Sequence, residues 1–397
     1  MITRRSALTI TAAGLGLHTF PTTTAAAATT AATARPGATA ESGGAAGPAL
    51  PRPTGRHPVG TRSFPLTDAS RTDPFAPHPG PRELMVQLWY PLGPDPYGTR
   101  TAPYTDAETG AAVESASGFA PGVLATVRAH ARRGGPPAAG TRTAVLLSHG
   151  RGSSRVLTSG LAEELASHGH LVAAVDHTYD ASAVRFPDGR LLLGALPPAP
   201  DDWDAQDRLE TAVRAADLRT LADALTRRHR PAAGVAVTRI GLLGHSMGGA
   251  AAAEAIRLDR RFAAGLDLDG GLFGTTAADT GLDRPFLLLT SSPDHDTWAR
   301  WRANHRHWGR HLHLTGGGHL SATDVPALAG AARLRELWPE ALLREHLGTL
   351  APDRAATVTR AVTTAFFDRF LLGRERPLLD GPSPRYPEIE FRWTHRA

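Results

Sequence analysis

The sequence has 397 residues, of which 41% are hydrophobic, so the chain is long enough to bury a sizeable core. It contains no cysteine, which excludes disulfide bonds, thiolate metal sites and a cysteine nucleophile. The net charge is +5, and all 43 basic residues are arginines scattered along the chain, so no basic block predicts a nucleic-acid partner. The positive charge favours at most a weak, transient contact with an anionic lipid surface.

Residues 1–34 are typical of a twin-arginine export signal. Arg4 and Arg5 precede a modestly apolar stretch, and small residues that suit an A-x-A cleavage site follow at residues 25–27 and 32–34. The apolar stretch is too short and too rich in threonine for a transmembrane helix. We therefore expect a secreted protein exported by the twin-arginine route; the alternative is a disordered Ala/Thr tail.

The next segment, residues 35–58, is rich in proline, glycine, alanine and serine and predicts a flexible linker outside the fold. We expect the folded body, residues 59–397, to be a single catalytic domain. Its first two strands are predicted at residues 61–66 and 83–90 by their β-favouring composition.

Residues 97–140 carry little pattern. Within them, residues 118–127 are mildly amphipathic. The segment fits either a cap over an active site or a surface excursion of the scaffold, and periodicity does not separate these two interpretations.

From residue 144 onward, apolar strands alternate with helical segments. Strands are predicted at residues 144–148, 171–175, 240–244, 262–268, 285–290 and 311–314, and helices at residues 156–168, 203–230 and 353–372. This alternation predicts a mostly parallel sheet with helices on both faces.

One of these strands runs into a Gly-x-Ser-x-Gly motif. Residues 244–248 read Gly-His-Ser-Met-Gly, and an alanine-rich, helix-favouring segment follows. A strand, this motif and then a helix form a nucleophile elbow, in which the serine is exposed above the sheet on strained backbone. The motif therefore predicts an α/β-hydrolase fold with Ser246 as its nucleophile.

A serine needs a general base, and in α/β-hydrolases the chain order is serine, acid, histidine. His319 lies in a glycine-rich loop directly after the last predicted strand and is our choice for the base. The competitors are His295, His305, His307, His311 and His313. No carboxylates or thiolates accompany these histidines in the spacing of a metal site, so we interpret most of them as surface histidines. We expect neither a metal nor a cofactor.

Two aspartates are candidates for the acid that orients the base. Asp269 follows the strand at residues 262–268, and Asp294 follows the next strand along the chain. Both strand ends face the same edge of the sheet as the elbow, so the residues alone leave both candidates open.

The oxyanion hole of this fold uses two backbone N–H groups. Met247, directly after the serine, supplies the first. The loop at residues 149–152 fits the second, with the N–H of Arg151 as our choice, and we interpret His149 in this loop as structural.

At this point the sequence resembles the plasma-type (group II) platelet-activating-factor acetylhydrolase family of α/β-hydrolases. The resemblance is carried by residues 148–152, 165–177 and 244–249, and by the early stretches 58–62 and 83–91. It extends with gaps from about Val59 into the C-terminal helix, and the sequence departs from the family at residues 97–140 and 320–350.

The resemblance implies roles for several residues. It favours Asp269 over Asp294, because the family takes its acid from the strand end after the nucleophile helix in a Leu-Asp context. It also supports His319 as the base and Arg151 as the second oxyanion donor. Family members hydrolyse short or oxidised sn-2 acyl groups of phospholipids without calcium, so the expected function is a carboxylic-ester hydrolase of this kind.

Three alternatives stay open. A lipase-like or cutinase-like hydrolase of triglycerides or polyesters would share the elbow and would take its acid near Asp294. A secreted binding protein would retain the fold without the chemistry. Transacylation would replace water by an alcohol, and the sequence does not distinguish it from hydrolysis.

Overall fold

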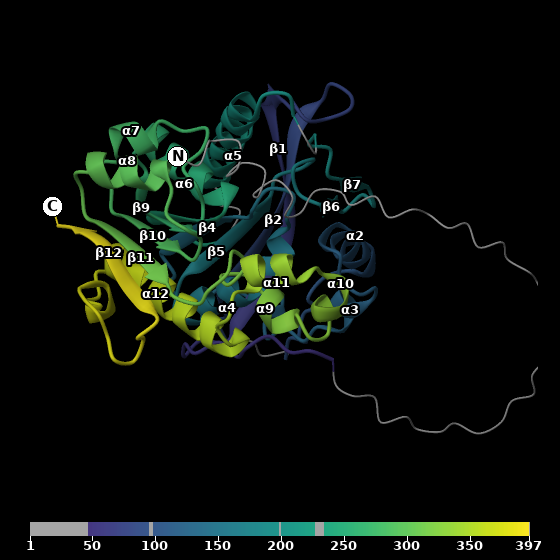
Figure 1. Cartoon of the computed structure of the whole chain (residues 1–397). Coiled ribbons are helices and arrows are strands. Elements are labelled where there is room, and N and C mark those ends of the chain that lie inside the picture. The colour runs from purple at the N-terminus through teal and green to yellow at the C-terminus, as the bar shows by residue number, and fades with distance from the viewer. Residues whose placement is uncertain (1–46, 95–97, 198–199, 227–233, 397) are drawn as a thin grey trace, which may run out of the picture.

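Figure 1 shows the computed structural model, which describes residues 47–94, 98–197, 200–226 and 234–396. The predicted export signal at residues 1–34 and the first part of the predicted linker lie outside the described residues. Among the described residues, no helix is both long enough and apolar enough to cross a membrane.

Within the described residues, a sheet of ten strands forms the frame. Its strands are β1 (Val59–Thr72), β2 (Pro81–Pro91), β3 (Arg132–Arg133), β4 (Thr143–Ser148), β5 (Leu171–Asp176), β8 (Arg239–His245), β9 (Phe262–Leu268), β10 (Phe286–Thr290), β11 (Gly309–Leu314) and β12 (Ile389–His395). Their order is β12-β11-β10-β9-β8-β4-β5-β2-β1-β3. The six strands from β11 to β5 are parallel, whereas β12 and β2 pair antiparallel at the two ends of this block. The sequence missed β12, which follows the C-terminal helix.

The helices are α2 (Ala107–Ser117), α3 (Val123–Thr126), α4 (Ser159–Ser167), α5 (Trp203–Thr226), α6 (Met247–Leu258), α7 (Ala277–Thr280), α8 (Asp296–Asn304), α9 (Val325–Leu328), α10 (Leu334–Leu337), α11 (Glu340–Leu347) and α12 (Pro352–Leu372), with short 3-10 turns η1 (Arg155–Thr158) and η2 (Pro377–Leu379). A separate hairpin joins β6 (Ala183–Arg185) to β7 (Leu191–Leu193).

Helices cover both faces of the sheet, as predicted (Figure 1). Alternate residues of β4 show the division: Ala144 and Leu146 belong to a core shared with α5, α6, α7 and α8, while Val145 and Leu147 belong to a core shared with α4 and α12. Side chains alternate along a strand, so a strand with an apolar residue at every position is buried on both faces. This arrangement is the α/β-hydrolase fold.

The two stretches that depart from the resembled family pack against each other. Helices α2 and α3 from the first, and α9, α10 and α11 from the second, share a third apolar core and gather at one side of the molecule in Figure 1. Phe119 and Trp338 meet there with ring centroids 6.3 Å apart, and the Trp338 indole donates to the Ser117 carbonyl at 3.2 Å. We call this group of helices the cap.

Residues 47–58 are packed against the folded domain and are not the flexible linker that their composition predicts. Leu50 is buried in the core of the cap, Thr54 bonds to the carboxylate of Glu164 through its backbone N–H (2.9 Å) and its hydroxyl, and the Gly55 N–H donates to Ser167 Oγ at 2.9 Å. We call residues 47–58 the N-terminal strap. Composition alone does not predict these contacts. A Pro/Gly-rich segment can still donate backbone hydrogen bonds and bury one apolar side chain against the folded domain.

Candidate active site

Ser246 occupies the turn between β8 and α6. Its φ of 54° and ψ of −126° place it outside the regions that non-glycine residues usually adopt, as an elbow nucleophile requires. The turn tolerates only glycine at position 244, because a Cβ there would lie 1.9 Å from the carbonyl oxygen of Gly248. The Ser246 N–H donates to the carbonyl of Leu268 at 2.9 Å, which ties the elbow to the end of β9.

The structure brings His319 and Asp269 together. His319 Nδ1 lies 2.7 Å from Asp269 Oδ2. The other acceptor positions of the carboxylate are filled by the N–H groups of Ser291 (2.6 Å) and Ser292 (2.8 Å) and by the Ser292 hydroxyl (2.6 Å). Burial alone would raise the pKa of Asp269, but the hydrogen bonds and charge of His319 and the bonds from Ser292 outweigh burial and lower this pKa. A buried aspartate is thereby kept ionised beside the imidazole.

Asp294, the other candidate acid, lies elsewhere. Both of its carboxylate oxygens bond to the guanidinium of Arg302, at 2.9 and 2.7 Å, and its side chain is 43% exposed. This hydrogen-bonded pair, against the opposing effect of burial, lowers the pKa of Asp294. The aspartate therefore serves a partly exposed ion pair with α8.

The five competing histidines do not form a metal site: no group of three or more potential ligands occurs among the described residues. Each of the five has a hydrogen-bond partner in the fold. His305 and His311 are fully buried, so the expectation of surface histidines is wrong for these two. His305 stacks on Trp301 with ring centroids 4.6 Å apart, and His311 bonds to Thr290 and Arg302. Burial is the main cause that lowers the pKa of His305 to about 4 and that of His311 to about 3.

The backbone around His319 is held from two sides. His245, directly before the serine, lies with Nε2 2.8 Å from the His319 carbonyl and therefore donates through this nitrogen. On the other side, the His319 N–H donates to the Glu345 carbonyl of α11 at 3.0 Å, and the next N–H donates to the His346 carbonyl at 2.8 Å. Burial and the charge of His319 lower the pKa of His245 to about 3, so its ring is neutral at pH 7. The sequence did not predict these supports, since they depend on which segments meet in space.

The segments that carry the two predicted oxyanion donors both lie next to the serine. Met247 is the first residue of α6, so its N–H has no carbonyl partner within the helix. The loop that carries Arg151 passes beside the elbow: a Cβ on Gly150 would lie 3.3 Å from Ser246 Cβ. The Arg151 side chain points to α5, where it bonds to Glu210 at 2.6 Å and to Asp207.

A second Ser-His-Asp arrangement lies beneath this loop. His177 joins Ser148 to Asp217, with Ser148 Oγ 2.8 Å from His177 Nε2 and Asp217 Oδ2 2.9 Å from His177 Nδ1. All three residues are fully buried, so no substrate reaches them. His149, interpreted as structural from the sequence, is buried beside them with Nδ1 2.7 Å from the Gly150 carbonyl oxygen.

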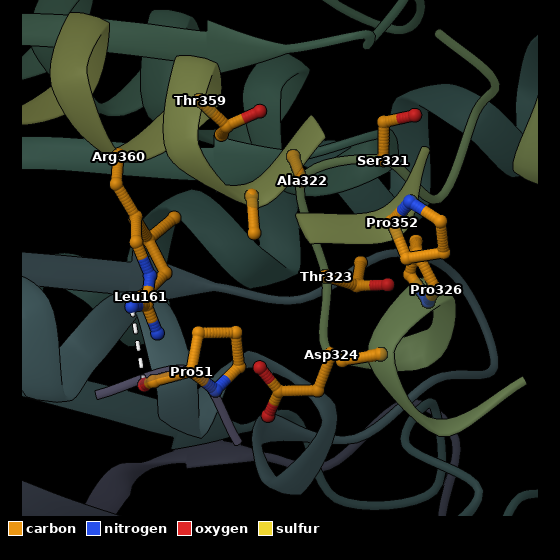
Figure 2. A pocket seen from close by; sticks show the side chains of 12 residues that line it. Pro51, Leu161, Ser321, Ala322, Thr323, Asp324, Pro326, Pro352, Thr359 and Arg360 are labelled. Carbon is orange, nitrogen blue, oxygen red and sulfur yellow. Dashed lines mark hydrogen bonds between the residues drawn. The ribbon is translucent and has the colours of Figure 1, made fainter. Parts of the chain in front are cut away.

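A small pocket lies between α12, the N-terminal strap and residues 321–327 of the cap (Figure 2). Arg360 and Asp324 line it, and both already have protein partners. Arg360 donates to the Pro51 carbonyl at 3.2 Å, and Asp324 accepts from the Tyr104 hydroxyl at 2.9 Å. This pocket contains none of the predicted catalytic residues.

The fold and the site define an α/β-hydrolase that acts on carboxylic esters. The model of the family "Platelet-activating factor acetylhydrolase, isoform II" matches residues 122–186. A protein of Arthroderma benhamiae named "Probable 1-alkyl-2-acetylglycerophosphocholine esterase" is 30% identical over 385 residues, which cover 86% of this chain and 93% of the relative. The solved structure of the ferulic acid esterase from Streptomyces cinnamoneus is 40% identical, covers 88% of this chain and all of its own, and superimposes with a TM-score of 0.79.

The chain belongs to the platelet-activating factor acetylhydrolase family. The sequence-based resemblance to this family and the expectation of a carboxylic-ester hydrolase are thereby confirmed.

Proposed function

We propose that Ser246, His319 and Asp269 are the catalytic triad of this esterase. The observation that carries the proposal is the 2.7 Å contact between His319 Nδ1 and the buried, multiply hydrogen-bonded carboxylate of Asp269. This contact fixes the imidazole tautomer with a proton on Nδ1 and leaves Nε2 free to accept the proton of a serine hydroxyl.

In the proposed reaction, Ser246 attacks the ester carbonyl while His319 takes its proton. The N–H groups of Met247 and Arg151 bind the oxyanion of the tetrahedral intermediate. His319 then protonates the leaving alcohol, and a water molecule activated by His319 releases the acyl group. Each oxyanion donor contributes about 3 kcal/mol of transition-state stabilisation.

We propose short-acyl esters of glycerophospholipids as the substrate class, with 1-alkyl-2-acetylglycerophosphocholine as the first compound to test. The relative of this name aligns over most of both chains, which supports the assignment. A second candidate is a hydroxycinnamoyl ester, because the ferulic acid esterase is the more similar protein by identity.

We further propose that the protein is exported by the twin-arginine route, on the evidence of the Arg4-Arg5 pair and the short apolar stretch behind it. A phospholipid substrate would then be met at an external lipid surface. The arginine-rich composition supports a transient electrostatic contact there.

The test compares initial rates on a set of esters for the wild type and Ser246→Ala. The set contains acetyl- to long-acyl sn-2 phosphatidylcholines, methyl ferulate, p-nitrophenyl acetate and a polyester film. Phospholipid turnover that falls with acyl length and vanishes in the variant supports the first substrate class, and preference for methyl ferulate supports the second. Turnover mainly of polyester would indicate a cutinase-like enzyme, and no turnover of any ester would overturn the proposed triad.

A further inference from the structure

Arg214, in the middle of α5, is a fully buried arginine whose guanidinium points at the loop that carries the proposed second oxyanion donor. Its Nη2 donates to the Gly150 carbonyl at 3.2 Å, and its Nη1 donates to the His149 carbonyl. One side chain thus holds two consecutive carbonyl groups of this loop.

The charge of this arginine is balanced by Asp180. The two side chains form a bidentate pair, with Nε and Nη2 each 2.6 Å from a carboxylate oxygen. Burial would raise the pKa of Asp180, but the charge and hydrogen bonds of Arg214 lower it to about 2. Bidentate arginine–carboxylate pairs fix the plane of the guanidinium, so the remaining N–H groups have a defined direction toward the loop.

These contacts of Arg214 with the two carbonyl groups also determine where the N–H group of each of the same two peptides points. The described residues contain no cis peptide, and in a trans peptide the C=O and the following N–H point in opposite directions. With the Gly150 oxygen bonded to Arg214, the N–H of Arg151 points away from that guanidinium. The serine lies close to this loop, since a Cβ on Gly150 would be 3.3 Å from Ser246 Cβ.

Helix α5 also holds the loop at a second point. Glu210 lies one helical turn before Arg214, and Asp207 lies nearly one turn before Glu210, so the three share one helix face. Glu210 and Asp207 bind the Arg151 side chain, whose guanidinium lies 5.3 Å from the ring of Trp203 at the start of α5. Helix α5 therefore contacts the Gly150–Arg151 peptide group through the Gly150 carbonyl, and it also binds the Arg151 side chain that follows this peptide group.

We propose that Arg214 is a positioning residue for the oxyanion hole, which keeps the Gly150–Arg151 peptide turned so that its N–H is available to the developing oxyanion. This inference rests on the proposed triad and extends it. Without the guanidinium, the His149 carbonyl would lose its arginine donor, and the Gly150 carbonyl would keep only its contacts with His149 Nδ1 (2.7 Å) and the Ser153 N–H (3.2 Å). The Gly150–Arg151 peptide would then be held less firmly and could rotate. A rotated peptide would present its oxygen instead of its N–H, and the site would lose a donor.

The experiment compares Arg214→Met, Arg214→Lys and the wild type. Arg310→Met is the matched control, because Arg310 is also buried and also donates to backbone carbonyls, those of Leu379, Gly309 and His395, but lies on β11. Four quantities are measured: kcat and KM on p-nitrophenyl acetate, the inhibition constant of phenylboronic acid and the thermal unfolding midpoint. The adduct of phenylboronic acid with the serine imitates the tetrahedral intermediate.

We expect Arg214→Met to lower kcat by about 100-fold or more with little change in KM, as loss of an oxyanion donor does. The boronate inhibition constant should rise by a similar factor. Arg214→Lys, which retains the charge opposite Asp180 and can reach one carbonyl, should recover part of both losses. Arg310→Met should lower the unfolding midpoint and leave kcat and boronate binding close to wild type.

The inference is overturned if the Arg214 variants lower the midpoint but bind the boronate as the wild type and Arg310→Met do. If Arg214→Met does not fold, Arg214→Lys decides the question by the same comparison of kcat with boronate affinity. A wild-type protein that neither hydrolyses esters nor binds the boronate would instead overturn the proposed triad, so the two failures are distinguishable.

Discussion

Ser246 and Asp269 both have a positive φ angle, which is uncommon for residues other than glycine. Their φ angles are 54° and 57°, and such left-handed conformations cost non-glycine residues about 1–3 kcal/mol each. The surrounding structure holds both: the Ser246 N–H bonds to the end of β9, and the Asp269 N–H donates to the Leu289 carbonyl of β10 at 2.9 Å. Each residue directly follows its strand, so both lie at the same edge of the sheet, where Asp269 contacts His319.

The first prediction distinguishes the two candidate acids. Asp269→Asn should lower kcat by about 10⁴-fold, because the amide cannot stabilise an imidazolium and disturbs the tautomer of His319. Asp294→Asn should leave turnover intact and change the free energy of unfolding by less than about 1 kcal/mol, since it weakens only a partly exposed ion pair. Initial ester-hydrolysis rates and thermal midpoints of both variants check this. Loss of turnover in Asp294→Asn alone, with both proteins folded, would show the assignment to be wrong.

The N-terminal strap shows how an element can escape sequence-based prediction. Its composition is that of a linker, yet Leu50 is 98% buried in the core of the cap, with an exposed fraction of 2%. Its backbone reaches three parts of the molecule: the Leu50 N–H donates to the Arg128 carbonyl at 3.1 Å, Thr54 binds Glu164 of α4, and Arg360 of α12 donates to the Pro51 carbonyl. The strap therefore joins the cap to the helices of one sheet face.

The second prediction follows from this element. With the protein lacking residues 1–46 as the reference, Leu50→Ala should lower the free energy of unfolding by about 2–5 kcal/mol, the usual cost of truncating a buried leucine. Deleting residues 1–58 should cost more than Leu50→Ala, because it also leaves the carboxylate of Glu164 without its partners on Thr54. Urea unfolding of the three proteins provides the measurement. Equal stability of the two deletions would contradict a structural role for the strap.

Local patterns in the sequence predicted the elements whose signal is local. The apolar runs gave the parallel strands, and the elbow motif gave Ser246, because both depend on neighbours in the chain. The cap pairs Phe119 with Trp338, which are far apart in the sequence, so no local pattern reports it. The buried position of Arg214 was not predicted for a related reason. A charged residue in a helical segment is expected to be exposed to solvent, and only the contacts with Asp180 and Gly150 in the folded structure show that Arg214 is buried.

At the scale of the whole molecule, the site is assembled where the carboxyl ends of β4, β8, β9 and β10 meet elements from elsewhere. Helix α5 braces the loop after β4, and α11 of the cap holds the loop of His319. Asp324 is one of the residues that attach the cap to the body. This carboxylate accepts from Tyr104 of the first excursion at 2.9 Å and from the Gly160 N–H of α4 at 3.0 Å.

Burial raises the pKa of Asp324 to about 7, against the lowering effects of Tyr104 and Arg360. Its pKa in the unfolded chain is near the ordinary 3.8, so between about pH 4 and pH 7 the native state keeps a proton that the unfolded state has lost. Stability from this group is therefore fully present at low pH and is lost as the pH rises to 7. Buried His177 and His346 act in the opposite direction: burial, as the largest cause, lowers the pKa of each to about 4, so they destabilise the native state as the pH falls below 6.5.

The third prediction separates these opposing effects by substitution. Asp324→Asn removes the carboxyl titration and leaves both histidines in place, so the difference in unfolding free energy between wild type and variant isolates Asp324. Between pH 5 and pH 8 we expect the wild type to lose about 3 kcal/mol relative to Asp324→Asn. Urea unfolding at several pH values measures this difference, and Asp296→Asn, at a largely exposed carboxylate on α8, is the control that should run parallel to the wild type. A constant difference between wild type and Asp324→Asn would mean that this buried carboxyl group is ionised throughout, and that the cap is held by its charge and not by its protonated form.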